Sequence, residues 1–229
     1  MKTRILLTLL ALPLAMSAAP PPSAVDQKAT ALESQLNKTL DSSPQAAKVM
    51  LELVDLYYKE GRVFGLVRVG ERFTKAQSSH ARHREVMVKL LDGLEVMARR
   101  DELITVAREH LSRYPDSADA IDVVQRLGDA LFLRRKPLEA ATAYRALWLH
   151  RPVVANRIAA QRASEHYTST GNNRIRVRAA EMAESLLDKL PGGEYTLRAG
   201  LRAVNEYRTI SRYVESNLVI QKMFKLDST

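Results

Sequence analysis

The chain contains no cysteine. Disulfide bonds and thiolate chemistry are therefore excluded, both as a means of stabilising the fold and as the source of a catalytic nucleophile. Glycine is scarce, with 9 residues in 229, and the sequence has neither a glycine-rich phosphate loop nor an HExxH metal motif. We therefore expect a protein that is not an enzyme and that needs no cofactor.

Histidine is also rare and scattered. Of the five histidines, only His80 and His83 lie close together in the sequence. The neighbouring residues Arg82 and Arg84 carry positive charges that would repel a metal cation. We interpret both histidines as ordinary exposed side chains and expect no metal site.

The only long apolar run lies at the N-terminus. Lys2 and Arg4 precede an apolar stretch over residues 5–16, and small residues follow it. This stretch is shorter than the roughly 20 apolar residues that a membrane-spanning helix needs. The pattern predicts a signal peptide over residues 1–19, with an uncleaved N-terminal anchor as the alternative. Because the chain also lacks cysteine, we expect a bacterial protein that is periplasmic or secreted.

The rest of the chain divides into a short linker and a helical domain. Residues 20–24 include three consecutive prolines and predict a stiff linker. Residues 25–229 are rich in alanine, leucine, arginine and glutamate, which favours helix. Apolar residues spaced by three and four predict a first helix from Val25 to Leu40. Ser43 before Pro44 then predicts the start of the next helix.

The net charge is +9, from 35 basic and 26 acidic residues. The arginines are scattered along the chain and are not clustered with aromatic residues, so we expect no nucleic acid partner. Two interpretations of the basic excess stay open. It is either an ordinary solvated surface or a surface that is attracted to anionic components of the cell envelope.

Residues 124–152 show the pattern that organises the domain. Two short amphipathic segments meet at a polar break, which predicts a helical hairpin. Gly128 and Ala140 lie where the two helix backbones would approach closely. Leu131 and Tyr144 are larger and would fill the space beside them.

The pattern repeats along the chain. Asp55, Asp92 and Asp129 are spaced by 37 residues, and Glu165 follows after 36. A period in this range is typical of a solenoid, in which neighbouring hairpins bury a shared core. The alternative is a non-repetitive helical bundle with coincidental spacing. The predicted repeats cover residues 45–78, 82–115, 118–152, 155–191 and 193–226.

The third copy resembles the tetratricopeptide repeat (TPR) family at Leu127, Gly128, Leu131, Ala140, Tyr144 and Pro152. Leu147 departs from the family, which favours a small residue there. The resemblance covers residues 47–191. It implies an all-α, right-handed α-solenoid of about five helical hairpins, preceded here by an extra N-terminal helix. It also implies a concave groove, lined mainly by the first helix of each repeat, that binds peptides or partner proteins.

If that geometry holds, the periodic acidic residues lie on the first helices and face the groove. Two interpretations remain open. In one, Lys89, Arg126 and Arg162 neutralise the acids three residues further along the same helices. In the other, the acids contact an extended ligand, and a basic ligand fits them best. The predicted partner-binding residues are Asp55, Tyr58, Asp92, Glu95, Asp129, Phe132, Leu133 and Glu165.

The last predicted helix is apolar on more than one side, at residues such as Tyr213, Leu218 and Phe224. A terminal repeat normally has a polar outer side. This helix therefore either packs back over the array or docks a partner or a second copy of the chain. The sequence favours an exported, non-enzymatic interaction scaffold or adaptor. The alternative is a structural accessory or oligomerisation module without a groove ligand.

Overall fold

The structure is a computed structural model that describes residues 23–190 and 192–227. The predicted signal peptide and residues 20–22 of the predicted linker lie outside these residues. The described chain folds into eleven α-helices and one 3-10 helix. They are α1 (Ala24–Leu36), α2 (Pro44–Lys59), α3 (Val63–Ala76), α4 (His83–Val96), α5 (Arg100–Arg113), α6 (Ala120–Leu133), α7 (Pro137–His150), η1 (Val154–Asn156), α8 (Arg157–Ser169), α9 (Asn173–Lys189), α10 (Glu194–Thr209) and α11 (Tyr213–Asp227).

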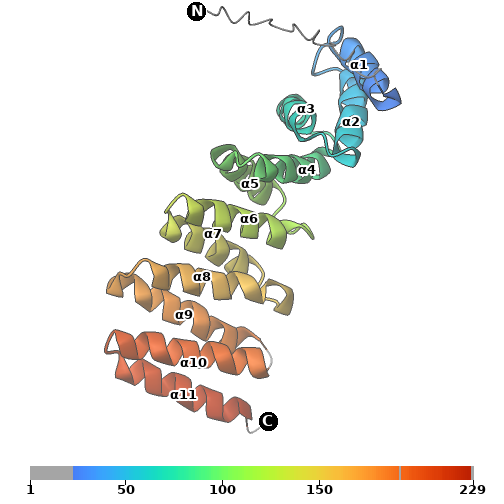
Figure 1. Ribbon diagram of the computed structural model, residues 1–229. Helices are drawn as coiled ribbons and strands as arrows, with labels where there is room; N and C mark the ends of the chain where they lie inside the picture. The colour runs from blue at the N-terminus through green and yellow to red at the C-terminus, as the bar shows by residue number, and fades with distance from the viewer. Residues whose placement is uncertain (1–22, 191, 228–229) are drawn as a thin grey trace, which may run out of the picture.

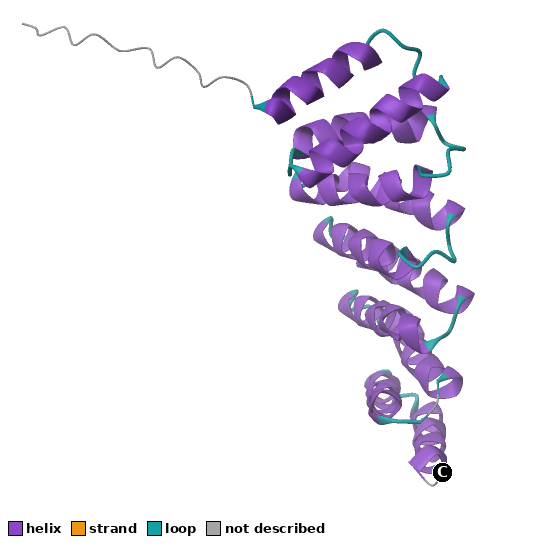
Figure 2. Cartoon of the chain, turned by 90° about the vertical axis from the view of Figure 1, so that its right-hand side faces the viewer, coloured by secondary structure: helices purple, strands orange, loops and turns teal. Residues whose placement is uncertain are grey.

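The helices stack in chain order from one end of the molecule to the other (Figure 1). Each helix packs mainly against the helix before it and the helix after it. Five hairpins result, α2–α3, α4–α5, α6–α7, α8–α9 and α10–α11, with α1 as an additional helix at the start. The turned view shows the same elongated stack of helix pairs (Figure 2). The predicted all-α stack of helical hairpins is confirmed, while its right-handed twist stays a prediction.

The turn inside each hairpin contains one residue in the left-handed backbone region. These residues are Gly61, Ala98, Arg135, Gly171 and Ser211, with φ between 54° and 67°. In four of the five turns an amide also donates to a carbonyl five residues earlier, a bond that terminates a helix. The four donor and acceptor pairs are Arg62–Tyr57, Arg99–Leu94, Lys136–Leu131 and Arg212–Tyr207, at 2.8–2.9 Å. The hairpins are therefore alike in backbone geometry even where the turn lacks glycine.

The start of the array follows the predicted signals with one difference. Ser43 caps α2, where its side chain accepts a hydrogen bond from a backbone amide of the first turn, as predicted. The predicted first helix to Leu40 is too long, because α1 ends at Leu36. The Thr39 hydroxyl donates to the Leu36 carbonyl at 2.9 Å and helps to close the helix end. Leu40 is consequently 79% exposed and does not extend the apolar stripe.

The core runs along the stack as four apolar clusters that cross hairpin boundaries. One joins α1 to α4, the next α3 to α7, the third α6 to α10 and the last α9 to α11. Gly128 contacts the second helix of its hairpin through the ring of Tyr144. A Cβ atom at Gly128 would lie 2.1 Å from Cε2 of Tyr144, whose side chain is buried. One helix backbone therefore packs directly on a tyrosine ring of the next.

Candidate partner-binding face

The first helices of the five hairpins, α2, α4, α6, α8 and α10, carry all of the predicted partner-binding residues. We call their exposed side the first-helix face. Asp55 and Tyr58 lie on α2, Asp92 and Glu95 on α4, Asp129, Phe132 and Leu133 on α6, and Glu165 on α8.

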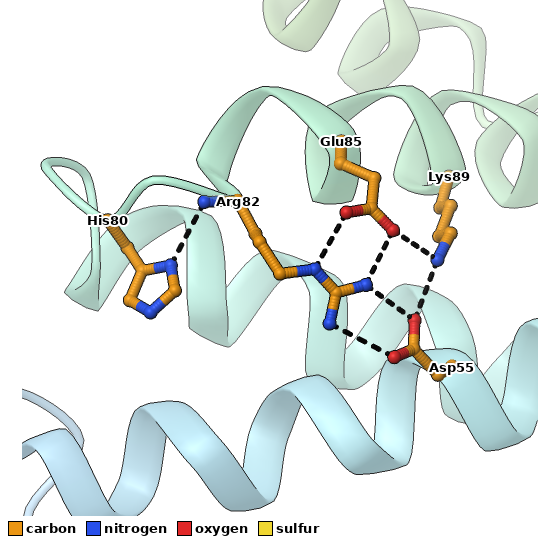
Figure 3. A network of polar contacts seen from close by, with 5 residues as sticks. All are labelled: Asp55, His80, Arg82, Glu85 and Lys89. Carbon is orange, nitrogen blue, oxygen red and sulfur yellow. Dashed lines mark hydrogen bonds and ion pairs between the residues drawn. The ribbon is translucent and has the colours of Figure 1, made fainter.

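Asp55 is paired with two cations that precede or belong to α4 (Figure 3). Arg82 donates to both carboxylate oxygens of Asp55, at 3.0 and 3.1 Å. The Nζ atom of Lys89 lies 2.7 Å from Asp55 and 2.7 Å from Glu85. Burial by itself would raise the pKa of Asp55, but the hydrogen bonds from Arg82 and Lys89 outweigh it and lower that pKa. The hydrogen bond from Arg82 is the main cause that lowers the pKa of Glu85 to about 2.

The same network continues towards α6. The Tyr58 hydroxyl donates to Asp92 at 2.8 Å, and Lys89 lies over the Tyr58 ring, 5.3 Å from its centroid. Arg126 of α6 pairs with Asp92 and lies 3.6 Å from Glu95. The hydrogen bond to Asp92 raises the pKa of Tyr58. Four predicted residues, Asp55, Tyr58, Asp92 and Glu95, are thus joined in one chain of contacts.

The interpretation in which each acid is neutralised within its own helix is wrong for two of the three pairs. Among the described residues Lys89 does not pair with Asp92, and Arg126 does not pair with Asp129. Each cation instead reaches back 34 residues to the acid of the preceding hairpin, Lys89 to Asp55 and Arg126 to Asp92. The constant offset of 34 residues is a signal in the sequence that could have revealed these pairs.

Glu165 pairs with one cation on its own helix and with another on the following hairpin. Arg162 lies 3.2 Å from Glu165 on the same helix, as the sequence predicted. Arg202 of α10 lies 3.3 Å from Glu165 and links it to the fifth hairpin. Arg202 was not singled out from the sequence, because its contact with Glu165 depends on how α8 and α10 pack.

Asp129 differs from the other periodic acids, Asp55, Asp92 and Glu165. Its side chain is exposed and forms no hydrogen bond or ion pair with any other described residue. One turn further along α6, Phe132 is 47% exposed and Leu133 is 63% exposed. These three residues, which we call the α6 site, place a free carboxylate beside apolar surface.

The α6 site packs against a buried histidine. The ring of His166 on α8 lies 5.1 Å from Phe132 and stacks on Tyr144 at 5.5 Å. Its Nε2 atom is buried and has no hydrogen-bond partner among the described residues. Burial lowers the pKa of His166, which favours the neutral imidazole. No sequence signal pointed to this contact, because it depends on how α6 and α8 pack.

His80 and His83, which lie three residues apart, differ in how deeply they are buried. The interpretation of His83 as an exposed side chain is wrong, because its ring is fully buried between Tyr114 and Thr74, at 3.0 and 3.2 Å. His80 is half-buried. Across residues 23–190 and 192–227 no three acidic or histidine side chains converge in a way that could hold a metal ion. In the same residues no helix has the length and apolar character to span a membrane.

Similarity to known proteins is found among solved structures. No protein-family model matches the chain, and no curated protein matches it. Two crystal structures of MamA share 18% sequence identity with it, with TM-scores of 0.49 and 0.47. They cover 80% and 77% of this chain, and 92% and 95% of their own chains. BtubC (BKLC) from P. vanneervenii shares 12% identity at a TM-score of 0.45, covering 90% of this chain and 92% of its own. Because these identities and TM-scores are low, the fold of this chain is established by its own helix packing.

Proposed function

We propose that this protein is an exported, TPR-like interaction scaffold or adaptor without enzymatic activity. It binds an extended peptide, or a segment of a partner protein, along the first-helix face. That face would be the concave groove which the TPR resemblance implies. The stack of hairpins supplies a rigid support for such a surface, because neighbouring hairpins pack against one another along its length.

The α6 site is the observation that carries this proposal. The acids on both sides of it are neutralised by cations from the following hairpin, Asp92 by Arg126 and Glu165 by Arg202. Asp129 has no such counterion among the described residues and keeps its charge available. A lysine or arginine of the ligand would pair with Asp129, and a neighbouring apolar side chain would cover Phe132.

Export to a bacterial periplasm, or secretion, is part of the proposal. Its support is the charged, apolar and small-residue pattern of residues 1–19. The basic excess of the chain supports a weak additional attraction to anionic envelope surfaces. Salt-sensitive sedimentation of the mature protein with anionic lipid vesicles tests that attraction.

A phage-displayed library of random peptides tests the binding function while the natural partner is unidentified. We expect the mature chain to enrich peptides that place a lysine or arginine beside apolar residues. Phe132→Ala and Asp129→Asn should each weaken the enriched peptides, with a loss of about tenfold or more for Phe132→Ala. Glu52→Gln is the matched control, since Glu52 is an exposed acid of α2 outside the α6 site. A library that yields no enriched peptide, or equal losses in the control, would overturn the proposal.

The second candidate is an accessory or oligomerisation module that docks through α11. Its support is the exposed apolar surface of that helix, where Tyr213 is 60%, Val214 72% and Leu218 51% exposed. Light scattering over a range of concentrations tests it. We expect Val214→Gln with Leu218→Gln to abolish self-association, while Val96→Gln, at another exposed apolar residue, leaves it unchanged. A monomer at every concentration in the unaltered protein would exclude self-association through α11.

A further inference from the structure

The connection from α7 to α8 exposes apolar side chains at one edge of the stack. Leu149, on the last turn of α7, is 53% exposed, and Val153 and Val154 in the connection are 37% and 50% exposed. Tyr195 of α10 is 63% exposed and lies beside the same segment. Its ring centroid is 4.6 Å from the guanidinium of Arg157, the first residue of α8.

Three arginines surround these apolar side chains. Arg145 lies one turn before Leu149 on the same side of α7, and Arg151 directly follows the helix. Both are exposed, and neither side chain forms a hydrogen bond or ion pair with another described residue. Arg157 donates from one Nη atom to the Val154 carbonyl at 3.1 Å and pairs with no described carboxylate. What we call the α7–α8 patch consists of Leu149, Val153, Val154, Tyr195, Arg145, Arg151 and Arg157.

Two acids lie next to the patch, and each already pairs with another cation. Asp116 pairs with His150 at 2.8 Å. Glu194, which precedes Tyr195, pairs with Arg198 at 2.5 Å. The patch therefore keeps the positive charge of its three arginines and is complementary to a negatively charged partner.

The valines are carried by an ordered turn. The Val153 amide donates to the Arg151 carbonyl at 2.9 Å, and the Asn156 side-chain amide donates to the same carbonyl at 3.0 Å. Pro152 between them has a restricted backbone. The apolar side chains are thus held in place before any partner binds, which lowers the entropy lost on binding.

An anionic lipid bilayer matches this arrangement of charge and apolar surface. Its headgroup layer is negative and its interior is apolar, so arginines and apolar side chains both find partners at one surface. Tyrosine favours the region between headgroups and acyl chains. An acidic polysaccharide would pair with the arginines but would leave the leucine and valines in water.

We propose that the α7–α8 patch binds the surface of an anionic phospholipid bilayer, with Arg145 and Arg151 on the phosphates and the two valines below the headgroups. This inference rests on the proposed attraction to anionic envelope surfaces and assigns that attraction to named residues. It does not use the α6 site, which lies near the opposite end of α7. Because α7 has 14 residues, the length of that helix is about 21 Å.

Sedimentation of the mature chain with lipid vesicles tests the role of the charges. We expect binding to vesicles of phosphatidylglycerol and phosphatidylcholine in equal amounts, and none to phosphatidylcholine alone. Arg145→Gln with Arg151→Gln should weaken binding about tenfold or more, since each arginine near an anionic surface contributes about fivefold. Arg157 is kept because it bonds the turn. The matched control, Arg174→Gln with Arg178→Gln, removes two exposed and unpaired arginines of the described α9 and should have a much smaller effect.

A tryptophan in the turn tests insertion. The fluorescence emission of Val154→Trp should shift to shorter wavelength when phosphatidylglycerol vesicles are added, because the indole leaves water. Trp148 is the one tryptophan of the chain and is 1% exposed, so it supplies a constant background. Val96→Trp, at an exposed valine of α4, is the control and should show no shift.

No binding to phosphatidylglycerol vesicles, equal weakening in both double variants, or vesicle binding without a shift at residue 154 would overturn the inference. Stronger binding to dextran sulfate than to the vesicles would assign the arginines to an acidic polysaccharide and overturn it as well. The proposed binding of peptides would survive each of these results if library peptides still depended on Asp129 and Phe132. Circular dichroism of each variant excludes a loss of helix as the cause.

Discussion

Lys89 on α4 places its Nζ atom 2.7 Å from Oδ1 of Asp55 on α2 and so links two consecutive hairpins through their first helices. The side chain of Lys89 is only 18% exposed, so the pair is partly shielded from water. Asp55 and Glu85 supply two negative charges, and Arg82 and Lys89 supply two positive ones. The network is therefore balanced, and removal of one member leaves an excess charge at the hairpin junction.

Asp55→Asn should lower the free energy of unfolding by about 1 kcal/mol, because it leaves Arg82 and Lys89 with Glu85 alone. For a chain of this size that corresponds to a fall in the melting temperature of about 2–4 °C. The loss should shrink at high salt, which screens the pair. Thermal melts followed by circular dichroism measure it. Glu52→Gln on the same helix is the control, and an equal loss in both variants would contradict a specific role for Asp55.

Gly128→Ala should destabilise the third hairpin strongly. The new methyl group would overlap the buried ring of Tyr144, and overpacking of this kind costs about 1–3 kcal/mol. Gly70→Ala is the matched helical control. There the nearest atom to a new Cβ is Leu90 Cδ1 at 3.4 Å, so helix propensity should keep the change near neutral or stabilising. Urea unfolding of both variants gives the comparison, and similar stabilities would show that α6 and α7 do not need the close approach.

Arg135→Gly and Ala98→Gly should each stabilise the protein. Both residues hold positive φ angles, 58° and 54°, which cost a side chain about 1–2 kcal/mol relative to glycine. Part of that gain is offset because glycine is freer in the unfolded chain. We expect a net gain of about 0.5–1 kcal/mol for each variant in urea unfolding. An equal or lower stability in both variants would mean that the strain is relieved in solution.

Acidification from about pH 7.5 to about pH 5.5 should destabilise the protein through its buried histidines. Burial lowers the pKa values of His83, His110 and His166 below the ordinary 6.5. As the pH falls through 6.5 the unfolded chain therefore takes up protons that the folded chain does not, which favours unfolding. Carboxyl groups with lowered pKa values, such as Asp26 and Glu85 at about 2, make the stability depend on pH only at lower pH.

His166→Phe isolates one contribution to this pH dependence. Phenylalanine keeps an aromatic ring between Phe132 and Tyr144 but has no proton to gain. Melting temperatures of the variant should therefore vary less over the same pH range than those of the unaltered protein. If the melting temperature of the variant varies with pH as much as that of the unaltered protein, His166 does not contribute. This holds whatever the substitution does to stability at neutral pH.

Much of the fold could be predicted because it is encoded locally. The apolar spacing within each helix, the Ser43 cap and the Gly128 contact are all properties of short segments. The left-handed turn residues show the limit of such signals. Glycine marks only Gly61 and Gly171, whereas Ala98, Arg135 and Ser211 adopt the same geometry without a composition cue. Their conformation is imposed by the packing of the two helices that they connect.

The candidate site was predicted only in outline. The placement of Asp55, Asp92, Asp129 and Glu165 on first helices follows from their period. The offset of 34 residues from Asp55 to Lys89 and from Asp92 to Arg126 is visible in the sequence, but whether the residues at that offset meet depends on the register between successive hairpins, which the sequence alone does not show. That register pairs Arg126 with Asp92 and leaves Asp129 without a counterion among the described residues.

The sequence by itself determined that the chain forms paired helices of a constant period, since helix formation and turn placement depend on residues a few positions apart. Only the tertiary structure decided which charges are neutralised and which have no counterion among the described residues. Those features depend on side chains more than 30 residues apart, such as Lys89 and Asp55. Their meeting is fixed by how closely neighbouring helices pack and how far each is rotated, and these quantities are set by the shared core as a whole.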